Sequence, residues 1–94
     1  MSRPERVELI RERLSAALHP EALDIVDESH RHAGHAGARS GGGHFKVKIT
    51  ADAFAGKTLI QRHRLVYDAL GDAMQKEIHA LSIDAKSPAE RSGA

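Results

Sequence analysis

The chain has 94 residues, of which 40% are hydrophobic and 29% charged, and its formal net charge is +1 at pH 7. This length predicts one domain over residues 1–94, because a chain of this size buries only about two-thirds of its unfolded surface and cannot support two cores. The absence of cysteine excludes disulfides and thiolate catalysis, and the short apolar runs and charged N-terminus exclude a membrane span and a secretory signal, so we expect a cytoplasmic globular protein.

The first element in chain order is a predicted helix that ends before His19 and Pro20. Ser2 and Glu5 fit a capping box that opens this helix. Apolar residues then recur at helical spacing, at Val7, Ile10, Leu14 and Leu18. The periodicity predicts a helix with one buried stripe.

Two strands are predicted next, over residues 22–28 and 44–50. The first is short and contains β-branched residues. The second alternates, with Phe45, Val47 and Ile49 on one face and His44, Lys46 and Lys48 on the other. Such alternation is typical of a strand that is buried on one face and exposed on the other.

A second helix is predicted to begin with a capping box formed by Thr58 and Gln61. Gly71 divides this helix into two pieces. The apolar stripe of the helix is expected to consist of Leu59, His63, Val66, Leu70 and Ala73.

Residues 78–86 form the third predicted strand, and Ser87 and Glu90 cap a last helical turn. The order α-β-β-α(-α)-β-α predicts an α+β fold, in which helices pack on a three-stranded mixed sheet and the core covers residues 5–88.

The order of the elements also predicts how the strands pair. The strands at 22–28 and 44–50 pair antiparallel, and the helix after Thr58 carries the chain back, so that strand 78–86 runs parallel to strand 44–50. The end of the first strand and the starts of the other two then meet at one end of the sheet. We therefore expect His79, at the start of the third strand, beside the loop over residues 29–43.

That loop, "SHRHAGHAGARSGGG", combines histidines with glycines, and we expect it to be flexible. His30, His32 and His35 lie in it, and the predicted topology brings His79 to its mouth, so imidazoles from two distant segments can share a metal. A solvated loop that binds Zn²⁺ or Ni²⁺ opportunistically remains an alternative.

Two further histidines are given other roles. His63 lies on the apolar stripe of its helix and is interpreted as a hydrogen-bonded structural residue. His44 begins a strand on its polar face and is interpreted as a rim residue of the loop site.

Between Arg39 and Arg64 the chain is basic, with Asp52 as the only acid. The candidate contacts to the phosphates of duplex DNA in this segment are Lys46, Lys48, Lys57, Arg62 and Arg64. A solvated charged face is the alternative. Single-stranded binding by base stacking is disfavoured, because the chain has only two phenylalanines, one tyrosine and no tryptophan.

The segments "VDESH", "ITADAFAGKTLIQRHRLVYDAL" and "IHALSI" resemble the BolA family, whose members have a class II KH-like fold. The resemblance implies a protein that is not an enzyme, has no small-molecule substrate, and shares a [2Fe–2S] cluster with a monothiol glutaredoxin in iron–sulfur or iron homeostasis. It also implies that His32 and His79 are the cluster ligands of this chain, with His30 and His35 as alternatives to His32. Some bacterial members of the family are DNA-binding transcriptional regulators, which is the alternative function.

The chemistry of the residues agrees with the shared cluster in one respect. Iron–sulfur clusters are held by thiolates, and imidazole replaces thiolate on one iron in some of them. Because this chain has no cysteine, a partner with thiols has to supply the remaining ligands.

Overall fold

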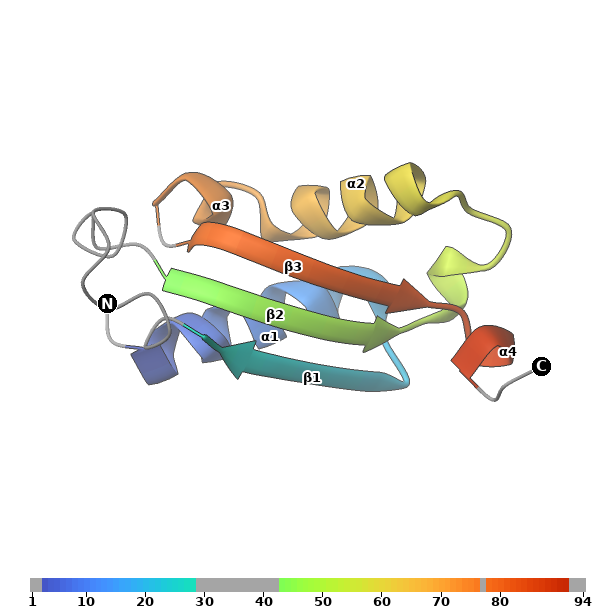
Figure 1. The fold of residues 1–94 in the computed structure, drawn as a ribbon, viewed down its shortest axis with the longest axis horizontal. Helices are drawn as coiled ribbons and strands as arrows, with labels where there is room; N and C mark the ends of the chain where they lie inside the picture. The colour runs from blue at the N-terminus through green and yellow to red at the C-terminus, as the bar shows by residue number, and fades with distance from the viewer. Residues whose placement is uncertain (1–2, 29–42, 77, 92–94) are drawn as a thin grey trace.

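The computed structural model describes residues 3–28, 43–76 and 78–91 (Figure 1). Its elements in chain order are α1 (Arg3–Leu18), β1 (Ala22–Asp27), β2 (Gly43–Thr50), a 3₁₀ turn η3 (Asp52–Phe54), α2 (Leu59–Leu70), α3 (Ala73–Lys76), β3 (Ile78–Lys86) and α4 (Pro88–Arg91). The predicted α+β order is confirmed, and η3 is an additional element that the sequence pattern did not predict.

The three strands form one mixed sheet in the order β1-β2-β3. β1 pairs antiparallel with β2, with Ala22 opposite Thr50 and Asp27 opposite Phe45. β2 pairs in parallel with β3, from Gly43 opposite Ile78 to Thr50 opposite Lys86. Both predicted strand pairings are therefore confirmed.

The core lies between one face of the sheet and the helices. Every second side chain of β2 is buried on this face, because strand side chains alternate between the two faces. They pack in one cluster with α1 and α2; its members include Phe45, Val47, Ile49, Ile10, Leu14, Val66 and Leu70. Lys46 and Lys48 lie on the opposite face of the sheet. In Figure 1, α1 passes behind the strands.

Helix ends follow the local chemistry of the sequence. α1 ends at Leu18, and His19 adopts a left-handed conformation with φ of 46°, a common way for helices to end. α2 begins with the predicted capping box, since both reciprocal hydrogen bonds between Thr58 and Gln61 are present. Gly71 follows α2 with φ of 56° and ψ of −130°, a conformation open mainly to glycine, which separates α2 from α3 as predicted.

Val66, Leu70 and Ala73 of the predicted stripe are in the core, whereas Leu59 and the half-buried His63 are not. Leu59 is 64% exposed, because the first turn of α2 lies outside the buried cluster. Ser2, which was expected to cap the first helix, and residues 29–42 of the predicted loop lie outside the described residues. Among the helices of the described segments, none is both long and apolar enough to cross a membrane.

Candidate functional site

One end of the sheet brings together the segments that flank residues 29–42. β1 ends there at Asp27, β2 begins at Gly43, and β3 begins at Ile78, as the left side of Figure 1 shows. The N–H of Glu28 donates a hydrogen bond of 2.7 Å to the carbonyl of His44, which extends the pairing of β1 and β2 to this end. The backbone of His79 therefore lies at the end of the sheet where the chain enters and leaves residues 29–42.

The pairing of β2 with β3 is irregular at His79. Gly43 is opposite Ile78 and His44 is opposite Ala80, so β3 carries one extra residue at this point, and that residue is His79. Such bulges occur frequently beside functional sites, because they change the local direction of the strand. The sequence pattern, which predicted one strand over residues 78–86, did not indicate this irregularity.

A small hollow of about 230 Å³ opens at the same end. Its lining combines a carboxylate, an imidazole, a hydroxyl and apolar groups, from Glu28, His44, Phe45, Ala80, Leu81 and Ser82. His44 lines this hollow, and its role as a rim residue of the loop site stays a prediction. Within residues 3–28, 43–76 and 78–91, histidine, aspartate and glutamate form no group of three or more that could hold a metal ion. His30, His32 and His35 lie outside the described residues.

The basic residues predicted to bind DNA do not share one surface. Lys46 and Lys48 lie on the open face of the sheet, where the cross-strand neighbours of Lys48 are Asp24 and Asp84. These carboxylates flank Lys48 on both sides, so the middle of this face is mixed in charge rather than basic.

Lys57 lies instead just before α2, and Arg64 lies in the second turn of this helix. Both are exposed, and they line a hollow of about 210 Å³ together with Gln61, Leu65 and Asp68. Two cations therefore stand against one carboxylate here, which makes this the more basic of the two regions.

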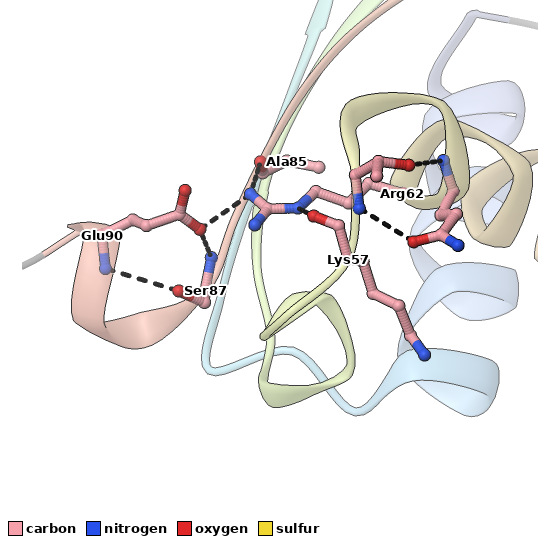
Figure 2. Close-up of polar contacts among 7 residues, drawn as sticks. Lys57, Arg62, Ala85, Ser87 and Glu90 are labelled. Carbon is pink, nitrogen blue, oxygen red and sulfur yellow. Dashed lines mark hydrogen bonds and ion pairs between the residues drawn. The ribbon is translucent and has the colours of Figure 1, made fainter.

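Arg62 is bound within the protein, although it lies between these two cations in the sequence (Figure 2). Its Nε donates to the carbonyl of Lys57, and its Nη1 donates to the carbonyl of Ala85, each at 3.0 Å. Nη1 also lies 2.7 Å from Oε1 of Glu90, and only 12% of the Arg62 side chain is exposed. The predicted phosphate contact of Arg62 stays a prediction, but these contacts give Arg62 a structural role.

His63 is half-buried on α2, and its Nε2 has no hydrogen-bond partner among the described residues. The hydrogen bond expected for a structural histidine is therefore not seen at this atom.

A family model for "BolA-like protein" matches residues 14–90, most of the chain. The chain belongs to the BolA-like family.

Its relatives differ in length. SufE-like protein 1 of Arabidopsis thaliana is 50% identical over 86 residues, which are 86% of this chain but only 23% of that protein. The protein named DNA-binding transcriptional regulator BolA in Escherichia coli is 42% identical over 76 residues, which are 81% of this chain and 70% of that protein. Among solved structures, the BolA domain of SufE1 from A. thaliana superposes with a TM-score of 0.79 and 48% identity, covering 90% of this chain and 94% of that one.

This BolA-like protein has two features at the start of α2 that sequence reasoning did not find. Leu59 and Ile60 are 64% and 70% exposed, although both are large and apolar. Glu90 is the anion that pairs with Arg62, and nothing in their separate sequence neighbourhoods signals the contact. Only the capping motif of Ser87 and Glu90 was readable in advance.

Proposed function

We propose that this BolA-like protein is a non-enzymatic adaptor that partners a monothiol glutaredoxin and shares a [2Fe–2S] cluster with it. The ligands from this chain are His79 and a loop histidine, His32 by the family resemblance, with His30 and His35 as alternatives. The observation that supports this proposal is the meeting of β1, β2 and β3 at one end, where His79 occupies the bulge next to the segment that carries these histidines.

The donor chemistry of the chain fits half of such a site. Imidazole replaces thiolate on one iron in clusters of the Rieske type, and the chain offers histidines but no cysteine. Each of the two iron ions of the cluster needs protein ligands. Histidines of this chain can bind one iron, so the other iron has to face a partner protein. The cluster supplies iron and one-electron chemistry, while the residues of this chain bind it, and the hollow beside His44 adjoins the place of contact.

The test is co-expression with a monothiol glutaredoxin, followed by purification and visible absorption spectroscopy. We expect a coloured complex whose spectrum changes when His79 is replaced by alanine. His63→Ala is the matched control, because His63 lies on α2 and not at this end of the sheet. A complex with the same spectrum in wild-type protein and in a His32→Ala, His79→Ala double variant would show that the partner alone holds the cluster.

A second candidate is a DNA-binding transcriptional regulator. The name of the E. coli relative supports it, as do the exposed cations Lys57 and Arg64 near the start of α2. The first turn of a helix also carries unpaired N–H groups that favour phosphate. We place the DNA contact on this side of the molecule, since Lys48 is flanked by Asp24 and Asp84.

This candidate predicts a specific salt dependence. In a Lys57→Ala, Arg64→Ala double variant, the slope of log K against log salt for duplex DNA should fall by about two units, because each lost phosphate contact removes about one. Lys46→Ala with Lys48→Ala is the control on the opposite face, and it should leave the slope near the wild-type value. The opposite ranking of the two double variants would move the DNA contact to the open face of the sheet.

A further inference from the structure

Two helix caps on different elements are joined by one arginine. On α2, Thr58 N–H donates to Oε1 of Gln61 at 2.9 Å, and Gln61 N–H donates to the Thr58 hydroxyl at 3.2 Å. On α4, Ser87 N–H donates to Oε1 of Glu90 at 2.8 Å, and Glu90 N–H donates to the Ser87 hydroxyl at 3.4 Å. Figure 2 labels the α4 cap residues Ser87 and Glu90, with Arg62 beside them.

Arg62 connects the turn before α2 to the end of β3 and to α4. We name this group of residues the Arg62 clasp; it consists of Arg62, Ala85, Ser87 and Glu90. Oε1 of Glu90 accepts the Ser87 N–H and also pairs with Nη1 of Arg62. Arg62 in turn binds the carbonyls of Lys57 and Ala85. The guanidinium is thus held by one carboxylate and two carbonyls, and this planar arrangement is one that lysine cannot reproduce.

The clasp completes the hydrogen bonding of an exposed turn. The Lys57 N–H donates to the carbonyl of Phe54 at 3.1 Å, and the Thr58 carbonyl accepts the Arg62 N–H at 3.0 Å. The Thr58 N–H donates to Gln61. The fourth backbone polar group of Lys57 and Thr58 is the Lys57 carbonyl, and it accepts a hydrogen bond from Arg62. The backbone of this turn is therefore fixed, while the Lys57 residue that it carries is exposed.

We propose that Glu90 and Ser87 are positioning residues for phosphate binding by Lys57, acting through Arg62. This inference rests on the second candidate function. In this arrangement Glu90 does not contact the phosphate. It pairs with the Arg62 guanidinium, and the guanidinium binds the Lys57 carbonyl. When the residues that orient a binding group are removed, its affinity for the ligand falls, because the group then loses conformational entropy on binding.

The charge of Glu90 makes the proposal testable by the sign of the effect. Removal of a carboxylate from a DNA-binding protein strengthens binding if charge alone matters, because the net positive charge rises. Loss of a positioning residue weakens binding in spite of this gain. Glu12→Gln is the matched control, since Glu12 is exposed on α1 and its replacement changes the net charge by the same amount as Glu90→Gln.

The experiment measures the affinity for a duplex of about 20 base pairs at one low salt concentration, a length that covers more than one helical turn. We expect Glu90→Ala to weaken binding about three- to tenfold, Glu90→Gln to weaken it less, and Glu12→Gln to leave binding unchanged or slightly tighter. In a double-mutant cycle, Glu90→Ala should have little further effect once Lys57 is replaced by alanine, because the two residues act as one unit.

Hydrogen exchange of the backbone amides, read by NMR, tests the clasp without DNA. In Glu90→Ala, exchange at Lys57 and Thr58 should accelerate about tenfold, while core amides of β2 keep their rates, since only a local opening becomes easier.

The outcomes separate the two levels of the proposal. If the wild-type protein shows no DNA binding that depends on Lys57, the second candidate function is rejected and phosphate positioning with it, and the exchange rates still decide whether the clasp holds the turn. If wild-type binding depends on Lys57 but Glu90→Ala binds as tightly or more tightly, the positioning role is overturned, and Glu90 then affects binding through its charge alone. Unchanged exchange at Lys57 and Thr58 also overturns it.

Discussion

Gly43→Ala tests the packing that sets the start of β2 beside the candidate site. A Cβ atom at Gly43 would lie 2.2 and 2.5 Å from two ring carbons of Phe45, where ordinary van der Waals contact begins at 3.4 Å. The ring would have to move by more than about 1 Å, and overpacking of this kind typically costs about 1–3 kcal/mol. Because Phe45 is only 1% exposed and belongs to the core cluster, the ring has no empty space to enter. We expect Gly43→Ala to lower the free energy of unfolding by about 3 kcal/mol, near the top of that range.

Gly56→Ala provides a comparison with a different physical cause. Gly56 has φ of +74°, and a Cβ there meets nothing within 4 Å, so the cost comes from the backbone conformation alone. That cost is about 1 kcal/mol. The structure therefore predicts that Gly43→Ala is the more destabilising substitution, although its backbone conformation is the less unusual.

Urea denaturation followed by circular dichroism measures both losses. For a domain of this size, about 3 kcal/mol corresponds to a decrease in Tm of more than about 10 °C. Phe45→Leu should cost less in the Gly43→Ala background than in the wild type, because the smaller side chain relieves the clash. If Gly43→Ala were less destabilising than Gly56→Ala, the Phe45 ring would not fill the space above Gly43 as described. In NMR spectra, Gly43→Ala should also shift the amide resonance of His79, since Gly43 adjoins the bulge.

Three more predictions concern titration and backbone strain. The Ser87 N–H and then Arg62 lower the pKa of Glu90 from 4.5 to about 2, so its contribution to stability is complete above about pH 4.5 and is lost as the pH falls through about 2. A carboxyl NMR titration should give that midpoint, Arg62→Lys should raise it, and a wild-type midpoint near 4.5 would contradict the clasp. A cluster bound through His79 should become labile below about pH 6, because imidazole binds metal only when neutral; visible absorbance should then decline before the far-UV circular dichroism does, and simultaneous loss would indicate unfolding instead. His19→Gly should raise the free energy of unfolding by up to about 1 kcal/mol, because glycine adopts a left-handed conformation without the steric cost that other residues have. His19→Ala should change this free energy by less than about 0.5 kcal/mol. Urea denaturation measures both changes.

The sequence by itself determined the helices and strands and most of their ends, but not the 3₁₀ turn η3. The caps at Thr58 and Ser87 were readable because each is closed by a partner three residues away. The buried face of β2 followed from alternation, since the side chains of a strand point to opposite faces in turn. The strand pairing followed because a connection with no predicted helix favours antiparallel neighbours and a helical crossover favours parallel ones.

The tertiary structure alone decided which of these residues meet. Lys48 and Lys57 belong to one basic stretch of sequence, but they lie in different regions because Lys48 is on the strand face that the helices leave open and Lys57 precedes the helix that covers the other. Arg62 looked like a third surface cation, and its contacts with Ala85 and Glu90 arise only when β3 returns alongside α2. The bulge at His79 also depends on the pairing of two strands. Local patterns carry no information on such contacts, because their partners are distant in the sequence and become neighbours only through packing of the sheet and helices.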